Sequence, residues 1–155
     1  MKILPFEKYS IESIKSIDEI CLLIDKNSEP YKFHFFRNSI PKPLVGERDG
    51  EEFELRRYIQ GRNSFLPIAS GKLSNYNGGT KIEISLEPHL AVTIFMVFWL
   101  FFVALFFIAF LSFSMFKASL IPLGMFIFAC LLMHFGFWLE VPKLKHLILR
   151  AIENG

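Results

Sequence analysis

The sequence is poor in the residue types that most often carry chemistry. It has 2 cysteines and 4 histidines, and His34, His89, His134 and His146 lie close to no cysteine or serine constellation. No glycine-rich segment leads into a helix, so no phosphate-binding loop is predicted. We therefore predict no catalytic residue, no metal site and no cofactor, and we expect a protein that is not an enzyme.

Charged residues are also scarce, but only in one stretch of the chain. Between Leu90 and Leu139 the chain has one charged side chain, Lys117, and one other titratable group, His134. About 20 apolar residues cross a bilayer as a helix, because every backbone polar group must be satisfied inside the segment. The stretch therefore predicts two transmembrane spans, about 90–111 and 120–139. Its phenylalanines recur on every helical face, which favours contact with lipid or other helices over a pore lining.

The few polar residues between the two spans predict the turn of a helical hairpin. They are Ser112, Ser114, Lys117, Ser119 and Pro122. Proline suits the first turn of a helix, so we expect Pro122 to begin the second span. The turn has a single lysine, whereas the flanks have Lys72, Lys81, Lys143, Lys145 and Arg150. The positive-inside rule then predicts a multi-pass protein of the cell inner membrane with both termini in the cytoplasm.

Two alternatives to the two-span interpretation stay open. The stretch could be a buried helix of a soluble protein, or it could be a single bent or re-entrant span, because the first apolar run continues to Phe116.

Cys130 and His134 lie four residues apart on one helical face and could both touch a metal, but two ligands do not make a metal site. We expect a neutral imidazole bonded within the hairpin instead.

The rest of the chain predicts one small β-rich domain. It holds 16 of the 17 Lys and Arg residues and all 15 acidic residues, and this near-neutral balance gives no reason to expect nucleic acid as a partner. Residues 1–89 form the cytosolic domain, residues 90–139 the hairpin, and residues 140–155 a C-terminal amphipathic helix. Cys21 and Cys130 fall in different parts, so we expect no disulfide between them.

The chain order predicts a mostly antiparallel sheet with two short helices, an α+β class. Strands are expected at residues 6–11, 31–36, 44–47, 52–59, 65–73 and 80–87, with a turn at Asp49 and Gly50. A helix is predicted over about 17–26, because Ser16 and Glu19 form a capping box before an apolar pattern of helical spacing.

The C-terminal helix has one apolar stripe, formed by Leu144, Leu147, Ile148 and Ile152. It could lie flat on an anionic leaflet, or it could close over the sheet, which we favour because the domain has one other helix. Four residues are expected at the membrane interface: Trp138, Lys143, Lys145 and Arg150.

The densest polar group outside the hairpin is a candidate ligand site. Arg56, Arg62, Asn63 and Ser64, with Arg37, could bind an anion such as a nucleotide phosphate or a lipid headgroup, because the arginine fork matches phosphate oxygens. The alternative is a solvated strand face, with Asn63 and Ser64 stabilising a turn and the arginines paired to Glu47, Glu52 or Glu54.

The segment YIQGRNSFLPIASG at residues 58–71, followed by GGTKIEISL at 78–86 and an apolar hairpin, carries a resemblance. It resembles an uncharacterised family of small bacterial two-span membrane proteins with an N-terminal β-rich domain. The most distinctive part is RNSFxP, here Arg62 to Pro67. The resemblance implies the architecture and no activity.

The sequence is consistent with three functions. The first is a non-enzymatic membrane protein whose cytosolic β domain binds a protein or small ligand at the membrane face. The second is an effector or immunity protein of a bacterial conflict system, and the third an accessory subunit of a larger membrane complex. The predicted partners are the lipid bilayer and a protein, or a second copy through the hairpin.

Overall fold

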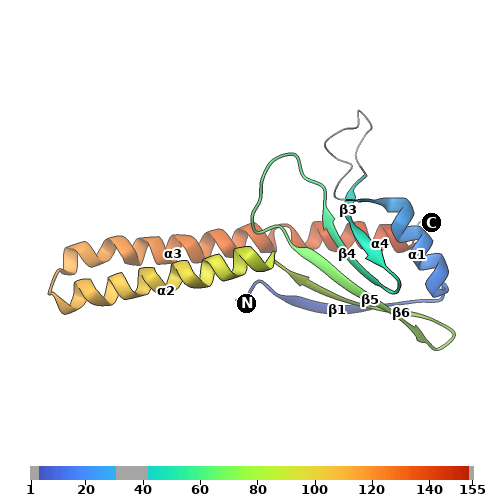
Figure 1. Cartoon of the computed structure of the whole chain (residues 1–155), viewed down its shortest axis with the longest axis horizontal. Coiled ribbons are helices and arrows are strands. Elements are labelled where there is room, and N and C mark those ends of the chain that lie inside the picture. Colours follow the sequence, from blue (N-terminus) through green and yellow to red (C-terminus); the bar gives the residue numbers. More distant parts are fainter. Residues whose placement is uncertain (1–3, 31–41, 154–155) are drawn as a thin grey trace.

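The computed structural model describes residues 4–30 and 42–153, and this part of the chain has the predicted α+β fold. A twisted sheet forms one end of the molecule, and a two-helix rod extends from it (Figure 1). The chain enters the rod from the last strand and returns from it into the C-terminal helix. The strand predicted at residues 31–36 lies outside the described residues.

The sheet has six strands in the described residues: β1 (Glu7–Ser13), β2 (Ser28–Glu29), β3 (Leu44–Asp49), β4 (Glu52–Arg57), β5 (Ile68–Tyr76) and β6 (Gly79–Glu87). Their order is β1-β6-β5-β4-β3-β2, antiparallel except for the short β2–β3 pair. Strands β3 to β6 form a meander, because each strand pairs antiparallel with the next strand along the chain. The first strand then adds to β6 at the far edge.

One face of the sheet is covered by two helices, α1 (Ile17–Asn27) and α4 (Val141–Glu153). The capping box at Ser16 and Glu19 is present, with the Ser16 amide donating to Glu19 Oε2 at 2.8 Å and the Glu19 amide to Ser16 Oγ at 3.3 Å. The core between sheet and helices includes these fully buried side chains: Ile20, Leu44, Leu55, Leu73, Ile82, Leu86 and Leu144. The chain returns from the rod to complete this core, so residues 1–89 are not a closed unit.

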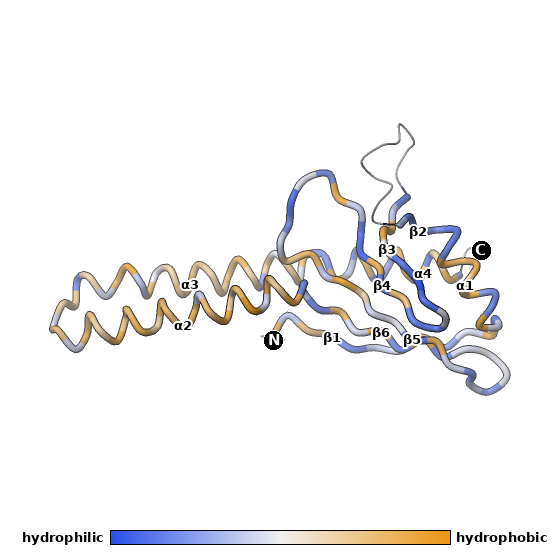
Figure 2. The backbone as a smooth tube through the Cα atoms, viewed as in Figure 1, coloured by the Kyte–Doolittle hydropathy of each residue, from blue (hydrophilic) through white to orange (hydrophobic). Residues whose placement is uncertain are grey.

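The rod is an antiparallel pair, α2 (Leu90–Ser112) and α3 (Phe116–Trp138). Both are long and apolar enough to cross a membrane, and Figure 2 shows hydrophobic residues along their whole length. The turn between them is shorter than predicted, because α3 begins at Phe116. The prediction that Pro122 begins the second helix is wrong: Pro122 lies inside α3.

The two helices α3 and α4 lie end to end, separated by Leu139 and Glu140 (Figure 1). The apolar residues of α4 pack into the core beneath the sheet, among them Val141, Leu144, Ile148 and Ile152. One nearly continuous helical axis therefore runs from the tip of the rod to the far side of the sheet.

Candidate functional site

The loop between β4 and β5, residues 58–67, joins the sheet to the rod. Asn63 Nδ2 donates a hydrogen bond to the Gly136 carbonyl of α3 at 2.9 Å, and Asn63 Oδ1 accepts one from the Phe65 amide at 3.0 Å. The Glu140 amide bonds to Phe137 instead of Gly136, so Asn63 supplies the partner for a carbonyl at the helix end. This side chain therefore closes a turn and fixes the loop to the end of α3.

Phe65 inserts from the same loop between the two helices of the rod. Its side chain is 9% exposed and packs with Met96 of α2 and Ala129 of α3. A β-carbon on Gly136 would lie 3.0 Å from the Phe65 side chain, so glycine at this position allows the close approach. We had expected Phe65 to begin a strand, and that prediction is wrong because β5 begins at Ile68.

The loop and the ends of β3 and β4 enclose a hollow of about 480 Å³, called here the arginine pocket. Four of the predicted ligand residues line it: Arg56, Arg62, Asn63 and Ser64. The fifth, Arg37, lies outside the described residues. The Arg62 and Ser64 side chains are exposed, and Arg62 makes no ion pair or hydrogen bond with the described residues.

A third arginine of the pocket, Arg57, is held by the junction between α3 and α4. Its Nε donates to Glu140 Oε2 at 2.8 Å, and Lys143 Nζ lies 2.8 Å from Glu140 Oε1. Burial alone would raise the pKa of Glu140, but the hydrogen bonds from Lys143 and Arg57 outweigh it and bring the pKa below its ordinary value. Glu140 is therefore a carboxylate at neutral pH, and it keeps Arg57 turned toward the helices.

The four residues predicted at the membrane interface have different surroundings. Trp138 is half-buried and packs on the core below the sheet. Lys143 pairs with Glu140, whereas Lys145 lies 2.9 Å from Glu7 and 4.4 Å from the centre of the Tyr9 ring. The Arg150 side chain is exposed on α4. Lys145 is thus engaged by the first strand.

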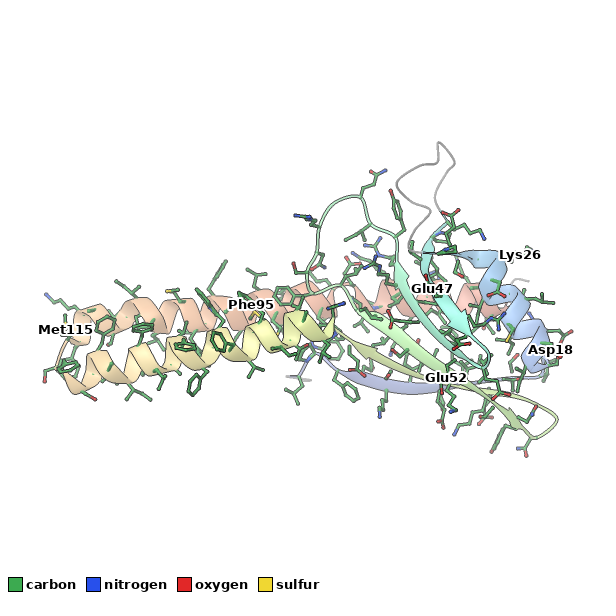
Figure 3. All side chains as sticks on the ribbon, in the orientation of Figure 1. Asp18, Lys26, Glu47, Glu52, Phe95 and Met115 are labelled. Atoms are coloured by element: carbon green, nitrogen blue, oxygen red, sulfur yellow. The ribbon has the colours of Figure 1, made fainter. Side chains whose placement is uncertain are left out.

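The face of the sheet opposite α1 and α4 is uncovered, and the sequence analysis did not single it out. It is hollowed over about 810 Å³ across β1, β6, β5, β4 and β3, and is called here the open face. Its lining contains the acids Glu47, Asp49, Glu52, Glu54 and Glu83 and the bases Lys8 and Lys72. Arg48 also borders it, but the Arg48 side chain pairs with Asp25 of α1 on the covered face. Figure 3 labels Glu47 on β3 and Glu52 on β4. The feature of the sequence that could have indicated this face is the set of polar residues that alternate with apolar ones in each strand.

A second hollow, about 420 Å³ and almost wholly apolar, lies on the rod and is called here the rod groove. Phe65 forms one part of its lining, and the rest comes from α2 and α3, including Phe95, Trp99, Phe128 and Leu132. Figure 3 shows Phe95 in the part of the rod nearer the sheet. The same loop therefore contributes neighbouring residues, Ser64 and Phe65, to the arginine pocket and to the rod groove.

Metal-ligating side chains do not gather in the described residues: no group of three or more His, Cys, Asp and Glu residues could hold an ion there. The imidazole of His134 lies against the rings of Phe135 and Trp138, at centroid distances of 5.6 Å and 6.4 Å. Cys21 and Cys130 are free thiols. His134 is packed among aromatic rings.

Comparison with known proteins adds no relative to this description. No protein-family model, no curated protein and no solved structure matches the chain. The resemblance of the RNSFxP segment to a family of small bacterial membrane proteins therefore stays a prediction. The structure gives this segment a mechanical role, because Asn63 and Phe65 fasten the sheet to the rod.

Proposed function

We propose that the chain is a two-span protein of the bacterial inner membrane whose β domain faces the cytoplasm and binds a partner protein without catalysis. The membrane part of the proposal is supported by the surface of the rod. In the most apolar stretch of α2, 11% of the residues are buried, and large side chains such as Phe98 and Phe106 are about 60% exposed. Core helices of soluble proteins bury such residues, and an apolar surface of this extent in water favours aggregation.

The orientation follows from charge near the ends of the rod. Lys117 is the one basic residue near the tip, whereas Arg57, Lys143 and Lys145 lie near the base. Basic residues are retained on the cytoplasmic side of bacterial spans. The sheet, the arginine pocket and both ends of the chain then face the cytoplasm.

The observation that carries the binding role is the open face. A sheet normally buries one face and solvates the other, but here the solvated face is hollowed and lined by five acidic and two basic side chains. Opposite charge across an interface guides association and selects the partner. The excess of acid favours a partner protein with a basic surface.

Membrane insertion is tested by fractionation and topology. We expect the full chain to stay in the pellet after alkaline carbonate extraction, and reporters fused after Gly155 and at Ser114 to be active on the cytoplasmic and the outer side respectively. Release by carbonate, or a reporter after Gly155 that is active outside the cytoplasm, contradicts the proposal.

The binding role is tested by cross-linking from the open face in intact membranes. A photo-reactive residue at Ser70 should give one protein adduct, and the same residue at Leu22, exposed on α1, is the control. Glu47→Lys should reduce the adduct, because it reverses a charge on the face that the partner contacts. Equal adducts from Ser70 and Leu22, or no effect of Glu47→Lys, exclude a protein site there and leave a small ligand to be sought.

A further inference from the structure

The arginine pocket has the chemistry of a site for a phosphate group. Arginine forks donate two parallel hydrogen bonds to phosphate oxygens, and a serine hydroxyl adds a donor. Arg56, Arg62 and Ser64 line one hollow with exposed side chains, while Glu140 holds Arg57 on the other side of the same strand end. Arg62 makes no ion pair with the described residues, so an incoming anion displaces no protein carboxylate from it.

The rod groove has the chemistry of a site for a hydrocarbon chain. Its lining is aromatic and aliphatic, and it runs along the packed faces of α2 and α3. Leu132 and Phe128 lie four and eight residues before Gly136, which places them about 6 and 12 Å along the helix from the loop contact. One leaflet of a bilayer has about 15 Å of hydrocarbon, so the groove spans most of that depth.

The two hollows are lined by consecutive residues of the loop. Ser64 lines the arginine pocket and Phe65 lines the rod groove, and Asn63 fixes both by its bond to Gly136. A ligand that fills both hollows has a phosphate at one end and a hydrocarbon chain at the other. Phe65 is itself buried between the helices.

We propose that the chain binds one anionic phospholipid of the inner leaflet, with its phosphate in the arginine pocket and an acyl chain in the rod groove. This inference rests on the membrane insertion proposed above and is independent of a partner on the open face. A zwitterionic lipid brings an ammonium group toward the arginines, and a free phosphate leaves the groove empty. An anionic headgroup complements the pocket, since each basic residue near an anionic surface contributes on the order of 1 kcal/mol.

The experiment uses the full chain in nanodiscs of phosphatidylcholine that contain a minority of phosphatidylglycerol with the same acyl chains. The lipids that stay bound when the protein is released are counted by native mass spectrometry. We expect one retained phosphatidylglycerol for each chain, with a preference of about tenfold over phosphatidylcholine, the ratio that 1.4 kcal/mol gives.

Two pairs of variants separate the two halves of the site. Arg62→Ala should abolish the preference for phosphatidylglycerol and Arg62→Lys should keep part of it, whereas Arg150→Ala, an exposed arginine on α4, should change nothing. Leu132→Trp should fill the groove and lower lipid retention. Leu131→Trp is the matched control, because Leu131 is 48% exposed against 44% for Leu132 but does not line the groove. Unchanged circular dichroism confirms that each variant is folded.

Three results overturn the inference. The first is equal retention of the two lipids, and the second is an effect of Arg150→Ala as large as that of Arg62→Ala. The third is displacement of the lipid by glycerol 3-phosphate with the same potency in wild type and Leu132→Trp, which identifies a site for soluble phosphates. Release of the chain by carbonate instead contradicts the proposed membrane insertion itself, so the two failures are distinguishable.

Discussion

Gly71 shows how a single glycine sets the packing of the sheet core. It lies directly opposite Phe53 across β4 and β5, and the Phe53 ring occupies the space where a β-carbon would be. Phe53 is itself buried. Gly71→Ala should therefore destabilise the fold by about 1 to 3 kcal/mol through overpacking. Thermal unfolding in detergent, followed by near-UV circular dichroism, measures the loss. Ser70→Ala, one residue earlier and on the open face, should change the midpoint little.

Glu140 gives the junction between α3 and α4 a dependence on pH. Its folded pKa is below the ordinary value of 4.5 because Lys143 and Arg57 bond to the carboxylate. A carboxyl with a lowered folded pKa stabilises the fold fully above its unfolded pKa and loses that contribution as the pH falls through the folded pKa. Glu140→Gln should cost about 1 to 2 kcal/mol at neutral pH.

The difference between Glu140→Gln and wild type should shrink as the pH falls below about 4.5, the ordinary value for this group. Denaturant unfolding of both proteins across this range measures it. A difference that stays constant down to strongly acidic pH would mean that Glu140 acts through packing and not through its charge.

The loop of residues 58–67 couples the sheet to the two-helix rod, which are separate segments of the sequence. Asn63→Ala removes the bond to Gly136 and the turn bond to Phe65, so we expect a loss of about 1 to 2 kcal/mol. Hydrogen exchange should become faster over the loop and the last turn of α3. Ser64→Ala is the control, because its exposed hydroxyl makes neither bond. Unchanged exchange at the end of α3 in Asn63→Ala would show that Phe65 alone holds the contact.

The turn of the rod has a helix C-cap with an unfavourable residue in it. The Met115 amide bonds to the Phe110 carbonyl and the Ser114 amide to Leu111, the pattern of a Schellman motif, and Ser114 has φ +56 where glycine is preferred. Ser114→Gly should stabilise the hairpin by about 0.5 to 1 kcal/mol. Ser112→Gly, two residues earlier at the last position of α2, should destabilise it by about 0.5 kcal/mol. Unfolding in mixed micelles measures both, and the same sign for the two changes would contradict the assignment.

The same turn shows what the sequence could not predict. The polar cluster predicts a hairpin, and its serines and proline predict a longer turn than the structure has. Helix α3 instead continues through Pro122, and Ser119 Oγ bonds to the Phe116 carbonyl at 2.8 Å within its first turn. Pro122 is the seventh residue of α3, so it removes the backbone donor that would bond to the Ala118 carbonyl inside the helix. The long apolar segment is helical throughout, in spite of the low helix propensity of proline.

For the whole molecule, hydropathy and strand alternation were sufficient to predict the class of fold. The start of α1 follows from the capping box, the bounds of α2 follow from the stretch without charge, and the turn between β3 and β4 follows from Gly50. Arg56, Arg62, Asn63 and Ser64 line one hollow, as their closeness in the chain predicts, and ligand binding there stays a prediction. The contact of Glu140 with Arg57 could not be predicted from the sequence, because the two residues are 83 positions apart and the hairpin lies between them.

The hairpin is an insertion between the sheet and the helix that completes its core, and this arrangement makes a test of the architecture. Leu90 and Trp138 begin and end an antiparallel pair, so they are about 8 to 10 Å apart and a short linker can join them. Replacing residues 91–134 by a glycine and serine linker, with Phe65→Ser to remove the side chain that packs on the rod, should give a soluble folded domain. Stopping the chain at Leu139 should instead leave the sheet unfolded, because Leu144, Ile148 and Ile152 are buried in its core. Gel filtration and circular dichroism compare the two, and a folded protein from the truncation would show that α4 is dispensable to the core.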